Sequence, residues 1–137
     1  MSVRTVEQDY RLFLLGIAAL LFAGTVVELL FTEHAESLVQ IIPFVLCGIG
    51  LSTVIAALAA PNRGVLRALR AIMVLIAAGS MYGIYEHLTH NFAFELEIRP
   101  GSTVGDVFWE ALSGASPFLA PGILALAATL AIAATYR

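Results

Sequence analysis

The chain has 137 residues and a formal net charge of −3, with 60% apolar and 12% charged residues. Average soluble chains have roughly 45–50% apolar and 25% charged residues, and a small domain cannot hide so much apolar surface from water, so a soluble fold is excluded. All seven basic residues are arginines, and they form no basic patch with interleaved aromatic side chains, which argues against a nucleic-acid partner. We therefore expect a single domain, an all-α integral membrane protein whose main partner is the lipid bilayer.

The first half of the chain predicts two membrane spans. Residues 10–31 form an apolar run in which only Arg11 and Glu28 are charged, and residues 38–60 carry no charge at all. A helix of about 20 residues reaches roughly 30 Å, the thickness of a hydrocarbon core. The first run is longer than the apolar part of a signal peptide and lacks its small-residue cleavage pattern, so we expect a retained helix. The short acidic segment 32–37 is expected to turn the chain between the two spans.

Residues 67–90 predict a third span, which follows the turn-forming residues 61–64. Gly79 and Gly83 within this span form a small-xxx-small pair, which lets another helix backbone approach closely. We interpret both glycines as helix-packing residues.

The hydrophobic period changes after the third span. Residues 92–98 alternate large apolar side chains with Ala and Glu, which is the period of a strand. We expect an extended segment that pairs within the chain or with a second protomer, because a lone strand has unpaired edges. It would belong to one structured loop outside the membrane, residues 91–116. The fourth span is then predicted at 117–136, or as a longer kinked helix that begins at Asp106.

The arginines orient this predicted four-helix transmembrane bundle. Six of the seven lie at one end: Arg4, Arg11, Arg63, Arg67, Arg70 and Arg137. Because basic residues concentrate on the cytoplasmic side, we expect a cell-membrane protein with both termini in the cytoplasm. The opposite, extracytoplasmic end holds all three histidines and eight of the ten acidic residues.

This acidic and imidazole-rich end contains the candidate site. His87 and His90 are three residues apart, and Glu86 and His90 are four apart, so each pair shares one side of a helix. Imidazole together with carboxylate suits a divalent transition metal such as zinc or copper. The predicted ligands are Glu28, His34, Glu86, His87 and His90. Further polar residues that could surround them are Glu33, Glu36, Gln40, Asp106 and Glu110.

Glu28 lies about one turn before the end of the first apolar run, where a charge is costly and usually faces the bundle interior. The side chain could reach water, hold a proton, or pair with His87 or His90. A purely structural contact with a histidine or tyrosine therefore stays open beside metal ligation.

Three functions are compatible with these features. The first is a binding module that holds a divalent metal or another cation at the Glu/His cluster. The second is a non-catalytic accessory or scaffold subunit that packs into a homo-oligomer or a larger membrane complex. The third is a small transporter, although the second span offers only uncharged polar residues midway across the membrane. We expect no catalytic residues, since only a bound metal could activate water or a nucleophile here.

Overall fold

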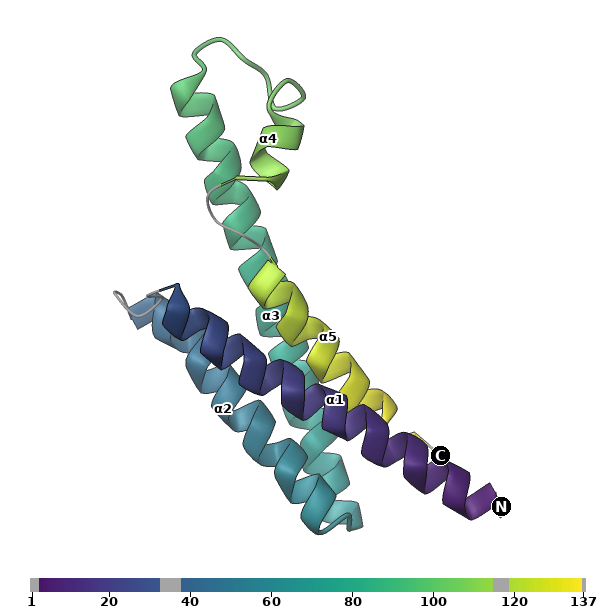
Figure 1. Cartoon of the computed structure of the whole chain (residues 1–137). Coiled ribbons are helices and arrows are strands. Elements are labelled where there is room, and N and C mark those ends of the chain that lie inside the picture. Colours follow the sequence, from purple (N-terminus) through teal and green to yellow (C-terminus); the bar gives the residue numbers. More distant parts are fainter. Residues whose placement is uncertain (1–2, 33–37, 115–118, 137) are drawn as a thin grey trace.

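The structure is a computed structural model that describes residues 3–32, 38–114 and 119–136. The secondary structure in these ranges is helical, in the order α1 (Val3–Phe31), α2 (Leu38–Ala59), α3 (Arg63–Ile98), α4 (Phe108–Leu112) and α5 (Leu119–Ala133) (Figure 1). Helices α1, α2 and α3 are long and apolar enough to cross a membrane. The predicted all-helical membrane class is confirmed to this extent. Helix α5 has 15 residues and is thus shorter than the roughly 20 residues that cross a hydrocarbon core.

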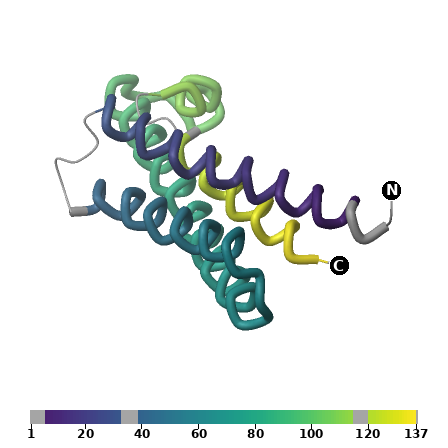
Figure 2. Tube along the Cα trace, turned by 60° about the horizontal axis from the view of Figure 1, so that its bottom comes forward, coloured from purple at the N-terminus to yellow at the C-terminus, as the bar shows by residue number. Residues whose placement is uncertain are grey.

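Helices α1, α2 and α3 run in alternating directions (Figure 1). Helix α5 packs against both α1 and α3, and α2 also contacts both of these helices. The first turns of α1 and the last turns of α5 therefore lie at one end of the molecule (Figures 1 and 2). The last turns of α1 lie toward the other end, and the first turns of α5 lie beside the middle of α3 (Figure 1).

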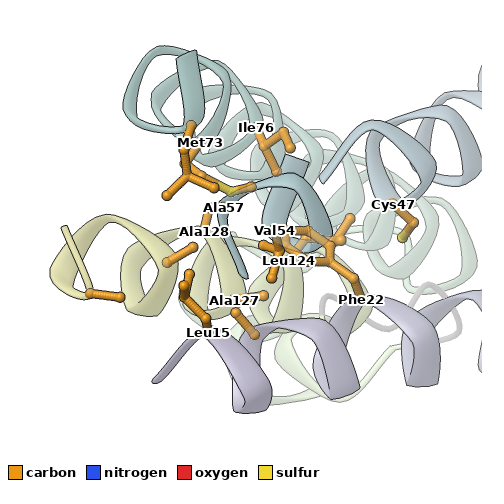
Figure 3. Close-up of a cluster of buried hydrophobic side chains, with 14 of the residues drawn as sticks. Leu15, Phe22, Cys47, Val54, Ala57, Met73, Ile76, Leu124, Ala127 and Ala128 are labelled. Atoms are coloured by element: carbon orange, nitrogen blue, oxygen red, sulfur yellow. The ribbon is translucent and has the colours of Figure 1, made fainter. Parts of the chain in front are cut away.

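The core between these helices combines a few large side chains with many small ones (Figure 3). Phe22 of α1 and Met73 of α3 are fully buried, and α5 contributes Ala127, Ala128 and Ala131. Alanine at such positions lets helix backbones approach closely, which is how packing stabilises helices in lipid. Large apolar residues cover the outward faces of the long helices and are exposed, as expected for surfaces that contact lipid.

Helix α3 is longer at both ends than the predicted span 67–90. It begins at Arg63 because the Asn62 side chain caps it, accepting a hydrogen bond of 3.0 Å from the Val65 N–H. It ends at Ile98 because Pro100 disfavours helical geometry at Arg99, whose φ and ψ are −124° and 73°.

The prediction of an extended segment over residues 92–98 is wrong, since these residues are the last two turns of α3. Phe92 and Leu96 also fit a helical period, four residues apart, and both are half-buried. Extending an existing helix costs less free energy than nucleating a new element of secondary structure, so the helix continues through the alternating pattern. Phe94 and Ile98, the other two large apolar residues, remain exposed.

With 36 residues, α3 is roughly 54 Å long and exceeds a hydrocarbon core of about 30 Å. Its last turns extend beyond α1, α2 and α5, and α4 lies beside them (Figure 1). We call residues 91–114 the α3–α4 lobe. Over residues 91–114, the described part of the predicted loop 91–116, the chain forms two turns of helix followed by a connection that contains α4. A continuous helix from Asp106 into the last span does not form, because α4 ends at Leu112 and a turn follows.

Candidate functional site

One face of α3 carries most of the predicted site. Glu86, His87 and His90 lie on it, about two to three turns beyond Gly79, and all four residues line the same hollow. Spacings of three and four residues place side chains on a common side of a helix, which is why this set gathers here. We call this cavity, of about 410 Å³, the α3 hollow.

The other walls of the α3 hollow are mainly apolar. Helix α1 contributes Leu29, α2 contributes Pro43 and Leu46, and α5 contributes Pro121 and Leu124. Its size lies within the roughly 300–1,000 Å³ of small-molecule sites, which likewise combine apolar walls with a few polar groups.

The glycines on this face let the neighbouring helices close the hollow. A Cβ atom at position 83 would lie 3.3 Å from the Pro121 Cβ, tighter than an ordinary contact, so α5 rests directly on Gly83. A Cβ at position 79 would lie 3.6 Å from a methyl carbon of Leu46, an ordinary van der Waals distance. Of the two glycines, Gly83 thus permits the closer approach.

Several polar side chains line the hollow. The Tyr82 hydroxyl donates a hydrogen bond to the Glu86 carboxylate one turn further along α3. His87 is half-buried, whereas Glu86 and His90 are exposed. Gln40 adds an amide from the first turn of α2. A bound molecule would therefore meet a carboxylate, two imidazoles, a phenol and an amide together with apolar side chains.

Glu28, the remaining predicted ligand that the structure describes, does not line this hollow. Glu28 precedes Leu29, and it is Leu29 that faces the cavity, because successive helical residues point about 100° apart. Glu28 instead uses its backbone carbonyl to accept hydrogen bonds of 3.0 Å from the N–H and the hydroxyl of Thr32. Glu33, His34 and Glu36 fall in residues 33–37, outside the described part of the chain.

The predicted zinc or copper site finds no support in residues 3–32, 38–114 and 119–136. Across these ranges, no group of three or more His, Cys, Asp or Glu side chains could hold a metal ion. Glu86, His87 and His90 share a helix face, but the facing walls from α1, α2 and α5 offer hydrocarbon and the Gln40 amide in place of a further ligand.

Asp106 and Glu110, predicted to surround the cluster, have separate roles in the α3–α4 lobe. The N–H and the hydroxyl of Thr103 each donate a hydrogen bond of 2.8 Å to Asp106 Oδ2, and these bonds lower the pKa of Asp106. Arg99 Nη1 lies 3.0 Å from Glu110 Oε1, and the hydrogen bond it donates lowers the pKa of Glu110. Both carboxylates thus stabilise the segment that connects α3 with α4.

Sequence reasoning missed the contribution of α5 to the hollow. Pro121 lies in the first turn of α5, where a proline is unstrained and presents an apolar ring to the hollow. Arg11 and Arg70 were used only to orient the chain, and their contacts with the end of α5 were not foreseen. The one available signal was the polar Thr135-Tyr136 pair directly after an apolar helix.

Comparison with protein-family models, with curated proteins and with solved structures gives no match, so the function is argued from the site itself.

Proposed function

We propose that the protein is a membrane-embedded binding module whose α3 hollow takes a small amphipathic cation. The observation that carries this proposal is the combination in one cavity of apolar walls from α1, α2 and α5 with the Tyr82–Glu86 pair of α3. A carboxylate supplies the opposite charge to a cation, and an aromatic ring attracts a cation through its π face. The apolar part of such a ligand would occupy the space beside Leu46 and Leu124.

The orientation proposed with this function has both termini in the cytoplasm and the hollow toward the other side of the cell membrane. It is supported by the arginines at the start of α1 and α3 and by the acidic character of the α3–α4 lobe. A ligand would then enter from the extracytoplasmic side or from the outer leaflet.

A binding measurement with three matched probes tests the proposal. Benzyltrimethylammonium should raise the melting temperature of the protein in mild detergent, and benzyl alcohol and benzoate should do so far less. Glu86→Gln keeps the shape of the side chain and removes its charge, so the affinity for the ammonium probe should fall about tenfold or more, at least 1.4 kcal/mol. Glu97→Gln is the control, because Glu97 lies on the same helix but does not line the hollow. Equal binding of the charged and uncharged probes would refute the proposal.

A second candidate function is the accessory or scaffold subunit, and the α3–α4 lobe favours it. Trp109 is 75% exposed and Phe94 and Ile98 are about half exposed, although the lobe extends beyond the other helices. Apolar side chains gathered outside a hydrocarbon core are typical of an interaction surface. Native mass measurement in mild detergent distinguishes the two functions, because a strictly monomeric particle without a co-purifying partner contradicts the scaffold and leaves the binding module intact.

A further inference from the structure

The opposite end of the molecule contains a second set of hollows, formed where α1 and α3 begin and α5 ends. One, of about 240 Å³, is lined by Glu7, Gln8 and Arg11 of α1 together with the end of α5. The other, of about 230 Å³, is lined by Arg63, Arg67 and Arg70 of α3. The two adjoin, because Leu66, Thr135 and Tyr136 line both. We call them together the arginine cleft.

Arg11 is the residue that marks the arginine cleft as a binding site. Its Nη2 atom is buried, and in the described part of the chain it has no hydrogen-bond partner. Glu7 lines the same hollow one turn earlier, but the ion pairs among the described residues are those of Arg99 and do not include Glu7 and Arg11. Burying a guanidinium nitrogen without a partner costs free energy, so native structures normally supply one. An anion bound in the cleft would lie against this guanidinium group and compensate its positive charge.

Arg70 shows how the cleft is built. Its Nε donates a hydrogen bond of 2.7 Å to Thr135 Oγ1, and its Nη2 donates one of 2.6 Å to the Thr135 carbonyl oxygen. Its guanidinium carbon also lies 5.5 Å from the centre of the Tyr136 ring. These contacts fix the end of α5 against the start of α3 and so hold the walls of both hollows in place.

Arg63 and Arg67 remain exposed at the mouth of the cleft. They occupy the first turns of α3, where the free N–H groups and the helix dipole add further positive potential. The guanidinium group matches the oxygen geometry of phosphate and binds it in a bidentate manner. Exposed Tyr10 and Phe13 lie close by along α1, where aromatic side chains mark the level of lipid headgroups.

We propose that the arginine cleft binds a phosphate group, with Arg11 and Arg67 as its main contacts and Arg70 as the residue that positions the cleft. The cleft lies at the end of the spans, where the phosphate of an anionic phospholipid is within reach; a free phosphate anion has the same chemistry. Basic pockets between helices at the cytoplasmic boundary meet a leaflet rich in anionic lipid.

The test compares lipids that differ in charge. Protein in mild detergent is mixed with phosphatidylglycerol, with phosphatidylcholine or with inorganic phosphate, and the melting temperature and bound lipid mass are measured. Phosphatidylglycerol should raise the melting temperature more than phosphatidylcholine and should remain bound in the mass spectrum. If inorganic phosphate alone gives the same rise, the cleft takes a free phosphate anion. If no anion differs from phosphatidylcholine, the proposal is wrong.

Two variants locate the effect. Arg11→Met removes the buried unpaired nitrogen, so this variant should melt at the same or a higher temperature in phosphatidylcholine but lose most of the gain from phosphatidylglycerol. Arg67→Gln should lower the affinity for phosphatidylglycerol about fivefold, as expected for one arginine near an anionic surface. Arg99→Gln removes the same charge at the other end of α3 and should keep the full lipid preference. A gain that is unchanged in both cleft variants would overturn the assignment.

Discussion

At the residue scale, glycine positions report where helices meet. A Cβ atom at Gly50 of α2 would lie 2.7 Å from two ring carbons of Phe22 on α1, and Phe22 is fully buried. The ring cannot move aside without disturbing the core, because protein interiors are packed to crystal-like density. The absent side chain at Gly50 therefore makes room for Phe22, the largest fully buried side chain among the described residues.

We predict that Gly50→Ala lowers the free energy of unfolding by about 1–3 kcal/mol, the usual cost of overpacking a core. Gly48→Ala is the matched control on the same helix, because an added Cβ there meets nothing within 4 Å. Thermal or denaturant unfolding in detergent measures both. The double variant Gly50→Ala/Phe22→Leu should recover part of the loss; if it loses the full sum of both single changes, the proposed contact is not the cause.

At the element scale, the α3–α4 lobe is held by contacts to the last two turns of α3. Asn91 Nδ2 donates a hydrogen bond of 3.0 Å to the Ala111 carbonyl oxygen, and a Cβ at Gly114 would lie 2.7 Å from the Asn91 side chain. The buried Glu95 lies 3.6 Å from Arg99, which also pairs with Glu110. The lobe thus depends on polar contacts at a helix end and on the fit around Asn91.

These contacts predict that acid loosens the lobe. Asp106 and Glu110 have folded-state pKa values below their ordinary values of 3.8 and 4.5. Their contribution to stability is therefore present above those ordinary values and is lost as the pH falls through the lowered ones. Trp109, the single tryptophan, packs edge-on against Phe108 at 5.3 Å in α4, so its fluorescence should change as the pH falls below about 4.5.

The control for this titration is the double variant Asp106→Asn/Glu110→Gln. It should show a smaller fluorescence change over the same pH range, because its side chains no longer take up protons there. An identical transition in the double variant would assign the effect to another carboxylate, with Glu95 the first to examine.

The elements also show what the sequence could and could not predict. Residues 38–60 were predicted almost to the residue, because an uncharged run of that length has few other solutions. The helical conformation of residues 92–98 was not predicted, because their apolar side chains fit the two-residue period of a strand. Only Phe92 and Leu96, four residues apart, also fit a helical period. The helix that precedes this segment and its packing on α4 determine its conformation, and neither can be read from the sequence of the segment itself.

At the scale of the whole molecule, α3 unites the two proposed sites. Arg63 and Arg67 of the arginine cleft lie at its start, and Glu86 and His90 of the α3 hollow lie about 20 residues later, roughly 30 Å along the helix. This separation equals the thickness of a hydrocarbon core. The positions of the charged residues in the sequence are enough to predict this separation. The walls of both sites depend on where α5 packs, and no sequence motif indicates this.

The central claim is that α3 crosses the membrane once and places its two ends on opposite sides. Single cysteines introduced as Pro61→Cys, before α3, and as Val104→Cys, in the lobe, test it directly in a Cys47→Ala background. An impermeant maleimide applied to intact cells should label the cysteine at position 104, and should label the one at position 61 only after the membrane is opened. Labelling of both positions in intact cells, or of position 61 alone, would contradict the account.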